Sequence, residues 1–137
     1  MHLTNYSVNR QNEAYVHNTS TKRDDQGHKW SLAALNEHLE KVGINMNLLW
    51  SRIYGLIIKT LICHEPQVQA GIKEHGLNRT NCFELLGFDI LIDSDLKPWL
   101  IEVNANSSLR ADSPLDLAVK STLLTDTLNL IGIQKSP

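Results

Sequence analysis

The residues best suited to chemistry in this 137-residue chain are two carboxylates and one amide, Asp89, Glu102 and Asn104. An apolar run ends at Ile92, a polar cluster follows, and a second apolar run returns over residues 99–103. Two short apolar runs separated by turn-forming residues are typical of a β-hairpin. The hairpin is therefore the element that must bring these three side chains together.

The turn of this hairpin predicts which residues face each other. With Asp95 and Leu96 at the tip, counting back along both strands places Asp89 opposite Glu102. Side chains alternate with period two along a strand, so Asn104 lies on the same side as Glu102. Because like charges that are directly opposed destabilise a sheet, we expect a cation between the two carboxylates.

Oxygen ligands of this kind suit Mg²⁺, which takes one or two carboxylates from protein and further ligands from water and phosphate. The alternative is that the acidic residues occupy the wet face of a hairpin, where carboxylates are common. Asp93 and Asp95 are interpreted in that way. The metal interpretation of Asp89 and Glu102 rests on their interrupting otherwise apolar strands.

Charge and hydropathy exclude some partners. The formal net charge is −2, and Lys22 and Arg23 are followed at once by Asp24 and Asp25. Without a basic run, nucleic acid is not an expected partner. The sequence also suggests no signal peptide and no apolar stretch long enough to span a bilayer, so no membrane partner is expected.

Cys63 and Cys82 occur in apolar surroundings and lack the spacing of metal ligands. We therefore expect two reduced thiols in the core of a cytosolic protein.

The remaining pattern predicts an α+β fold in which an antiparallel hairpin packs with helices. Ser31 and Ser113 are predicted N-caps, and Pro114 and Asp116 suit the first turn of the last helix. The second helix should be well buried through Leu49, Ile53, Leu56, Ile57 and Leu61, with Ile58 and Ile62 widening the stripe. The predicted order is a strand over residues 2–8, a loop over 9–29, helices over 32–42 and 46–64, a polar connection over 65–80, the hairpin, and a helix over 114–131.

Four separated motifs in this sequence closely resemble the tubulin–tyrosine-ligase-like family of ATP-grasp enzymes, and in particular its polyglutamylases. In order, they are His2-Leu3-Thr4-Asn5-Tyr6-Ser7-Val8-Asn9, Lys29-Trp30-Ser31, Lys97-Pro98-Trp99-Leu100-Ile101-Glu102-Val103-Asn104, and Asp112-Ser113-Pro114-Leu115-Asp116 with Lys120. The resemblance covers nearly the whole chain. It implies the C-terminal part of an ATP-grasp catalytic domain over residues 1–137.

The resemblance assigns two Mg²⁺ ions to the hairpin, with Asp89 on one, Asn104 on the other and Glu102 bridging both. It places Thr4 and Asn5 against ATP. From the residues alone, Thr4 and Asn5 could merely end a strand.

The resemblance also implies that Tyr6, Lys29, Ser31 and Lys120 surround the incoming glutamate. Ser31 is in any case a helix cap. Lys120 follows Asp116 by four residues, so a surface ion pair worth a few tenths of a kcal/mol is an alternative role. As the cation for a glutamate carboxylate, Lys120 would join Glu102 as a catalytic residue.

The implied function is ATP-dependent ligation of free L-glutamate to glutamate side chains of tubulin tails through an acyl phosphate, in the cytoplasm at microtubules, including those of cilia or basal bodies. The family usually has proline where this chain has Ser107, and its ATP-binding lysines precede the first motif. We therefore expect a fragment that is inactive alone. The alternatives are a tubulin glycine ligase, which Lys120 disfavours, and a non-catalytic module that binds tubulin or a partner.

Overall fold

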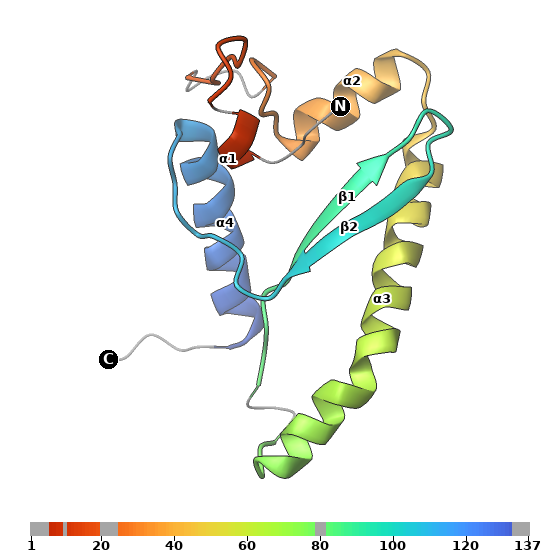
Figure 1. Cartoon of the computed structure of the whole chain (residues 1–137), viewed down its shortest axis with the longest axis vertical. Coiled ribbons are helices and arrows are strands. Elements are labelled where there is room, and N and C mark those ends of the chain that lie inside the picture. Colours follow the sequence, from red (N-terminus) through yellow and green to blue (C-terminus); the bar gives the residue numbers. More distant parts are fainter. Residues whose placement is uncertain (1–5, 10, 20–24, 79–81, 133–137) are drawn as a thin grey trace. The chain divides into compact units, whose positions relative to one another are not determined.

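The computed structural model describes residues 6–9, 11–19, 25–78 and 82–132. These residues form two compact units, one containing α1, α2 and α4 and the other containing α3 and the hairpin. The chain is α+β, as predicted, with one two-stranded antiparallel sheet. The elements are α1 (Tyr6–Asn9), α2 (Leu32–Lys41), α3 (Met46–Glu74), β1 (Gly87–Ile92), β2 (Pro98–Asn104) and α4 (Pro114–Leu130) (Figure 1).

Serine caps begin both long helices of the first unit. The hydroxyl of Ser31 accepts the backbone N–H of Ala34 at 3.0 Å, and that of Ser113 accepts the N–H of Asp116 at 3.1 Å. Each bond satisfies an N–H that has no partner within its helix. The predicted starts of α2 and α4 are confirmed, and Gly43, with a φ of 86°, follows the end of α2.

The predicted strand over residues 2–8 is wrong where the structure describes it. Tyr6–Asn9 forms a single helical turn, and the N–H of Gln11 continues it by donating to the carbonyl of Val8 at 3.2 Å. Residues 2–5 lie outside the described part. A strand needs a neighbour to complete its hydrogen bonds, whereas a helical turn bonds to itself.

The hairpin of the second unit pairs Asp89 with Glu102, as predicted. Its turn differs from the predicted one, and a bulge restores the pairing. Ile92 pairs with Pro98, so the turn comprises residues 93–97 and the register beside it differs by one from the prediction. A β-bulge at Ile101 absorbs the extra residue and restores the predicted pairing beyond it.

The sequence suggested that Asp93 is only an exposed carboxylate on the wet face of the hairpin. In the structure Asp93 organises the turn. Its Oδ1 accepts the backbone N–H groups of Asp95 at 3.0 Å and Lys97 at 2.9 Å, and its Oδ2 accepts the indole N–H of Trp99 at 2.8 Å. The bond from Trp99, followed by that from Lys97, lowers the pKa of Asp93 below its ordinary value. These bonds hold a turn in which Leu96 has a φ of 57°.

Helix α3 runs ten residues beyond its predicted end at residue 64 and ends at Glu74. It continues through Pro66, although proline removes a donor and crowds the preceding turn. Gln67, Gln69 and Ala70 favour helix beyond Pro66, and Gln69 donates to the side chain of Glu65 at 2.8 Å. Gly76, with a φ of 62°, lies just past the end of the helix.

The apolar stripe of α3 is buried only in its first half, where the helix packs against β2. Met46, Leu49 and Ile53 are buried, whereas Ile58 and Ile62 are 54% and 66% exposed. The prediction of a well-buried helix is therefore wrong for the part of α3 that begins at Ile58, because the hairpin covers only the first turns of the helix.

By length and composition alone, α3 could cross a membrane, contrary to the expectation that no apolar stretch is long enough to do so. Buried helices of water-soluble proteins meet the same two criteria.

Both cysteines are exposed, contrary to the expectation of core thiols. Cys63 lies in the second half of α3, and Cys82 precedes β1.

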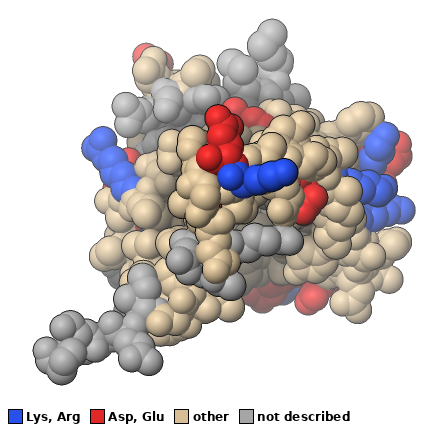
Figure 2. Space-filling model, turned by 90° about the horizontal axis from the view of Figure 1, so that it is seen from below, with Lys and Arg blue, Asp and Glu red and all other residues tan. Residues whose placement is uncertain are grey.

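Charged side chains are spread over the surface. On the face in Figure 2, the described Lys, Arg, Asp and Glu residues form small groups among uncharged ones. This distribution matches the near-neutral net charge of the chain.

We expect Asp93→Ala to lower the midpoint of thermal unfolding by several degrees, because it removes the acceptor of three hydrogen bonds in the hairpin turn. The measurement is a circular-dichroism melt combined with tryptophan emission, since Trp99 loses its indole partner. Asp95→Ala is the control, because it removes a neighbouring carboxylate of the same turn. Equal melting of the two variants would contradict the role given to Asp93.

Candidate functional site

The hairpin gathers the three side chains that the sequence singled out. Asp89 lies opposite Glu102, and the amide Nδ2 of Asn104 donates to Oε1 of Glu102 at 3.3 Å. Burial raises the pKa of Asp89, and the hydrogen bond and negative charge of Glu102 raise it further. The cluster therefore concentrates like charge beside the bulge at Ile101, a kind of irregularity that is frequent near functional sites.

The loop that follows β2 closes tightly on the start of β1. The hydroxyl of Ser107 donates to the carbonyl of Asn104 at 3.3 Å. A Cβ at Gly87, which pairs with Asn104, would lie 2.3 Å from the Ser107 oxygen. Gly87 therefore leaves room for the Ser107 hydroxyl in this position. The hydrogen bond of Ser107 fixes the loop at the position where the family usually has proline.

The chemistry of this cluster is that of hard oxygen donors. Within the part of the chain that the structure describes, no group of three or more His, Cys, Asp and Glu side chains is placed to hold a metal. The hairpin offers two carboxylates and one amide oxygen instead. This donor set fits a cation that completes its coordination with water and phosphate, as Mg²⁺ does.

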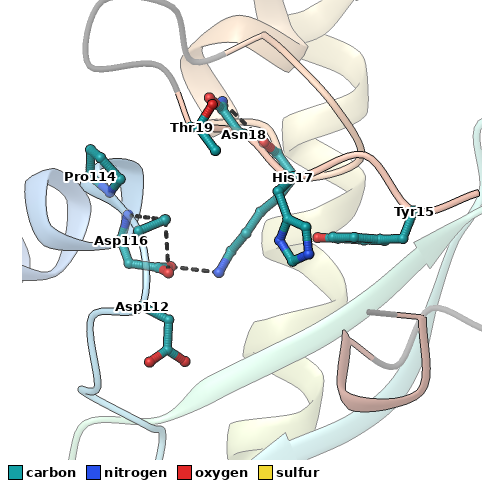
Figure 3. Close-up of a pocket in the computed structure, with 9 residues that line it drawn as sticks. Tyr15, His17, Asn18, Thr19, Asp112, Pro114 and Asp116 are labelled. Carbon is teal, nitrogen blue, oxygen red and sulfur yellow. Dashed lines mark hydrogen bonds and ion pairs between the residues drawn. The ribbon is translucent and has the colours of Figure 1, made fainter. Parts of the chain in front are cut away.

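The first unit contains a separate cavity of about 180 Å³, where the loop before α2 meets the start of α4 (Figure 3). In Figure 3 the labelled side chains of Tyr15 and His17 lie on one side of the cavity, and those of Asp112, Pro114 and Asp116 lie on the other. The full lining is Tyr15, His17, Asn18, Thr19, Lys29, Asp112, Ser113, Pro114 and Asp116.

An ion pair between a half-exposed lysine and a buried carboxylate forms one wall of this cavity. The Nζ of Lys29 lies 2.5 Å from Oδ1 of Asp116, whose residue is only 6% exposed. Ser113 donates its hydroxyl to Oδ2 of the same carboxylate at 2.9 Å. Burial alone would raise the pKa of Asp116, but the bonds from Lys29 and Ser113 and the charges of Lys29 and Lys120 lower it overall. Asp116 is therefore held ionised inside the wall.

Of the residues expected around glutamate, Lys29 lines the cavity and Ser31 caps α2. Lys120 donates to the backbone carbonyl of Arg110 and influences Asp116 only through its charge, so the alternative of a direct surface ion pair is wrong. Tyr6 belongs to α1, but its side chain is outside the described part. Thr4 and Asn5 lie outside the described residues altogether.

The sequence analysis missed the aromatic and histidine cluster that shapes the loop before α2. Tyr15 stacks on His28 with ring centroids 5.3 Å apart and meets His17 edge-on at 4.7 Å. The backbone N–H of Val16 donates to Nδ1 of His28 at 3.0 Å. The available signal was the recurrence of Tyr and His within the predicted loop over residues 9–29.

Comparison with known proteins gives a consistent result. The sequence profile described as "Tubulin-tyrosine ligase family" matches residues 1–137. The chain is 45% identical to human "Tubulin monoglutamylase TTLL4" over 96% of this chain and 11% of the relative. It is 44% identical to human "Tubulin polyglutamylase TTLL5" over 96% and 10%, and 44% identical to "Tubulin polyglutamylase ttll-5" of Caenorhabditis elegans over 95% and 18%. The chain thus spans between a tenth and a fifth of the length of these relatives.

We expect Asp116→Asn to lower the free energy of unfolding at pH 7 by about 1–3 kcal/mol, because it weakens charge-assisted bonds from Lys29 and Ser113. The pKa of Asp116 is lower in the folded chain than its ordinary value of 3.8. Its stabilisation is therefore complete above that value and is lost as the pH falls through the folded pKa.

Urea unfolding at pH 7 and in acid below pH 3 should show the difference between wild type and variant narrowing as the pH falls. Asp126→Asn, at an exposed position of the same helix, is the control. A difference that stays constant into acid, or an equal loss from Asp126→Asn, would contradict the assigned ion pair.

Proposed function

The chain belongs to the tubulin-tyrosine ligase family, and from that premise we propose that it takes part in ATP-dependent ligation of glutamate to glutamate side chains of tubulin tails. The observation that carries the proposal is the opposition of Asp89 and Glu102, with Asn104 beside them. The relatives supply the reaction class, since their names describe tubulin monoglutamylases and polyglutamylases.

We place residues 1–137 in the C-terminal part of an ATP-grasp catalytic domain. The two-stranded antiparallel sheet and the helices of the described residues support this assignment. Because the chain spans about a tenth of the human relatives, we propose that its residues require the remaining part of such a domain for turnover. The partners would be ATP, free L-glutamate and tubulin, and the place of action would be cytoplasmic microtubules.

The hairpin residues would hold Mg²⁺. Burial raises the pKa of Asp89, and the hydrogen bond and negative charge of Glu102 raise it further, so a divalent cation would relieve the repulsion between the two opposed carboxylates. Asp89 and Glu102 would hold the metal through their carboxylates, while Asn104 would add an oxygen without adding charge. The bound metal supplies neutralisation of the phosphate charge during activation of the acceptor carboxylate.

The cavity of the first unit would receive the amino acid. Lys29 lines it, and Asp116 holds the Lys29 ammonium in position from within the wall. Lys120 lies one turn further along α4, where it contacts the carbonyl of Arg110. Ser31, whose hydroxyl accepts the backbone N–H of Ala34 at the start of α2, would also belong to the amino-acid site. Tyr6 would complete the amino-acid site, and Thr4 and Asn5 would lie against ATP.

We expect the chain to bind Mn²⁺, used as a paramagnetic probe for Mg²⁺, in a saturable way, because two carboxylates and an amide oxygen converge on the hairpin. Asp89→Asn and Glu102→Gln should each weaken this binding about tenfold or more in an electron paramagnetic resonance titration. Asp95→Asn removes a carboxylate from the turn of the same hairpin and should have little effect. Equal weakening by Asp95→Asn would show only general attraction to negative charge.

The activity is tested in a chimera in which this chain replaces the matching 132 residues of mouse "Tubulin monoglutamylase TTLL4". We expect ATP-dependent incorporation of labelled glutamate into tubulin. Glu102→Gln should lower kcat roughly 100-fold or more, because catalysis of phosphoryl transfer depends on charge neutralisation. Asp126→Asn, at an exposed position of α4, should leave kcat within about twofold.

Incorporation of glycine in place of glutamate would overturn the donor assignment. A folded chimera that binds tubulin without turning over ATP would favour a non-catalytic binding module.

A further inference from the structure

The second unit contains a groove of about 650 Å³ between α3 and the turn of the hairpin. Its charged residues are Arg52, Lys59 and Lys97, against a single carboxylate, that of Asp95. Apolar side chains, among them Leu56, line the rest of the surface together with backbone. The groove therefore combines an excess of positive charge with a surface that favours contact with a peptide backbone.

Two of the three cations are held in place by the fold. The guanidinium of Arg52 donates to the backbone carbonyls of Asp95 at 3.3 Å and Leu96 at 3.1 Å, which ties the turn to the helix. The ammonium of Lys97 lies 3.6 Å from the ring centroid of Trp99. Ordering these side chains in the free protein reduces the entropy lost when a ligand binds.

The spacing of the cations on α3 fits an extended chain. Arg52 and Lys59 are seven residues apart, close to two helical turns, which corresponds to about 10.5 Å along one face. An extended peptide advances about 3.3 Å per residue and its side chains alternate between two faces, so carboxylates two and four residues apart on one face span about 7 and 13 Å, on either side of this distance. Gly55 lies between these two cations on the helix. The space beside it is open, because a Cβ built there would meet no atom within 4 Å.

We propose that this groove binds an extended, carboxylate-rich peptide segment, whose acidic side chains pair with Arg52, Lys59 and Lys97. The groove lies at the turn end of the hairpin, whereas Asp89 is four residues along the strand from Asp93, or about 13 Å away. It therefore holds a part of the peptide that does not react. The identification of this peptide with an acidic substrate tail rests on the proposed function, but the affinity of the groove for acidic peptide does not.

The test uses a fluorescently labelled peptide of alternating glutamate and glycine, with binding to the chain followed by fluorescence anisotropy in low salt. We expect saturable binding that weakens as salt is added, because partly exposed ion pairs are screened. Lys59→Gln and Lys97→Gln should each weaken binding about fivefold. Lys73→Gln removes the same charge from the same helix outside the groove and should change binding by less than twofold.

Several results would overturn the proposal. They are the absence of saturable binding, equal weakening by Lys73→Gln, and displacement of the peptide by inorganic pyrophosphate with the same dependence on Lys59.

Circular-dichroism melts of each variant serve as the control that the fold is retained. Glu102→Gln in the same assay should leave peptide affinity unchanged. A chain that binds the acidic peptide but fails the metal and chimera experiments would keep the groove assignment and lose only the identity of the partner.

Discussion

The opposition of two carboxylates across one hairpin, Asp89 and Glu102, is the constraint on which the second unit depends. Such a pair is unfavourable in a sheet unless a cation or a proton lies between its members. Burial raises the pKa of Asp89, and the hydrogen bond and negative charge of Glu102 raise it further. A hairpin selected for stability alone would not keep this pair, and the unfavourable contact is therefore the strongest sign of a ligand.

Several local devices maintain that opposition. Asp93 bonds the backbone of the turn and the indole of Trp99, which sets where the return strand begins. The bulge at Ile101 then shifts the return strand by one residue, so that Glu102 faces Asp89. At the far end, Gly87 leaves room for Ser107 to bond the carbonyl of Asn104. The bulge thus compensates for the one-residue shift of register beside the turn.

The first unit uses a buried charge in a different way. The carboxylate of Asp116 accepts bonds from Lys29 and Ser113, so its ionised form is stabilised instead of strained. This carboxylate joins the loop before α2 to the first turn of α4 and thereby shapes the cavity between them. Lys29 consequently has a structural role as well as the substrate-binding role that family membership suggests.

The sequence by itself determined what depends on neighbouring residues: the serine caps of α2 and α4, the hairpin, and the motifs that indicate the family. It also predicted the pairing of Asp89 with Glu102, because the extra residue in the turn and the bulge at Ile101 cancel each other. Only the tertiary structure decided the pairing of Lys29 with Asp116, 87 residues apart, and the exposure of the cysteines and of the second half of α3. Caps and hairpins arise from hydrogen bonds between residues close in sequence, whereas long-range pairs and burial depend on which elements the folded chain brings into contact.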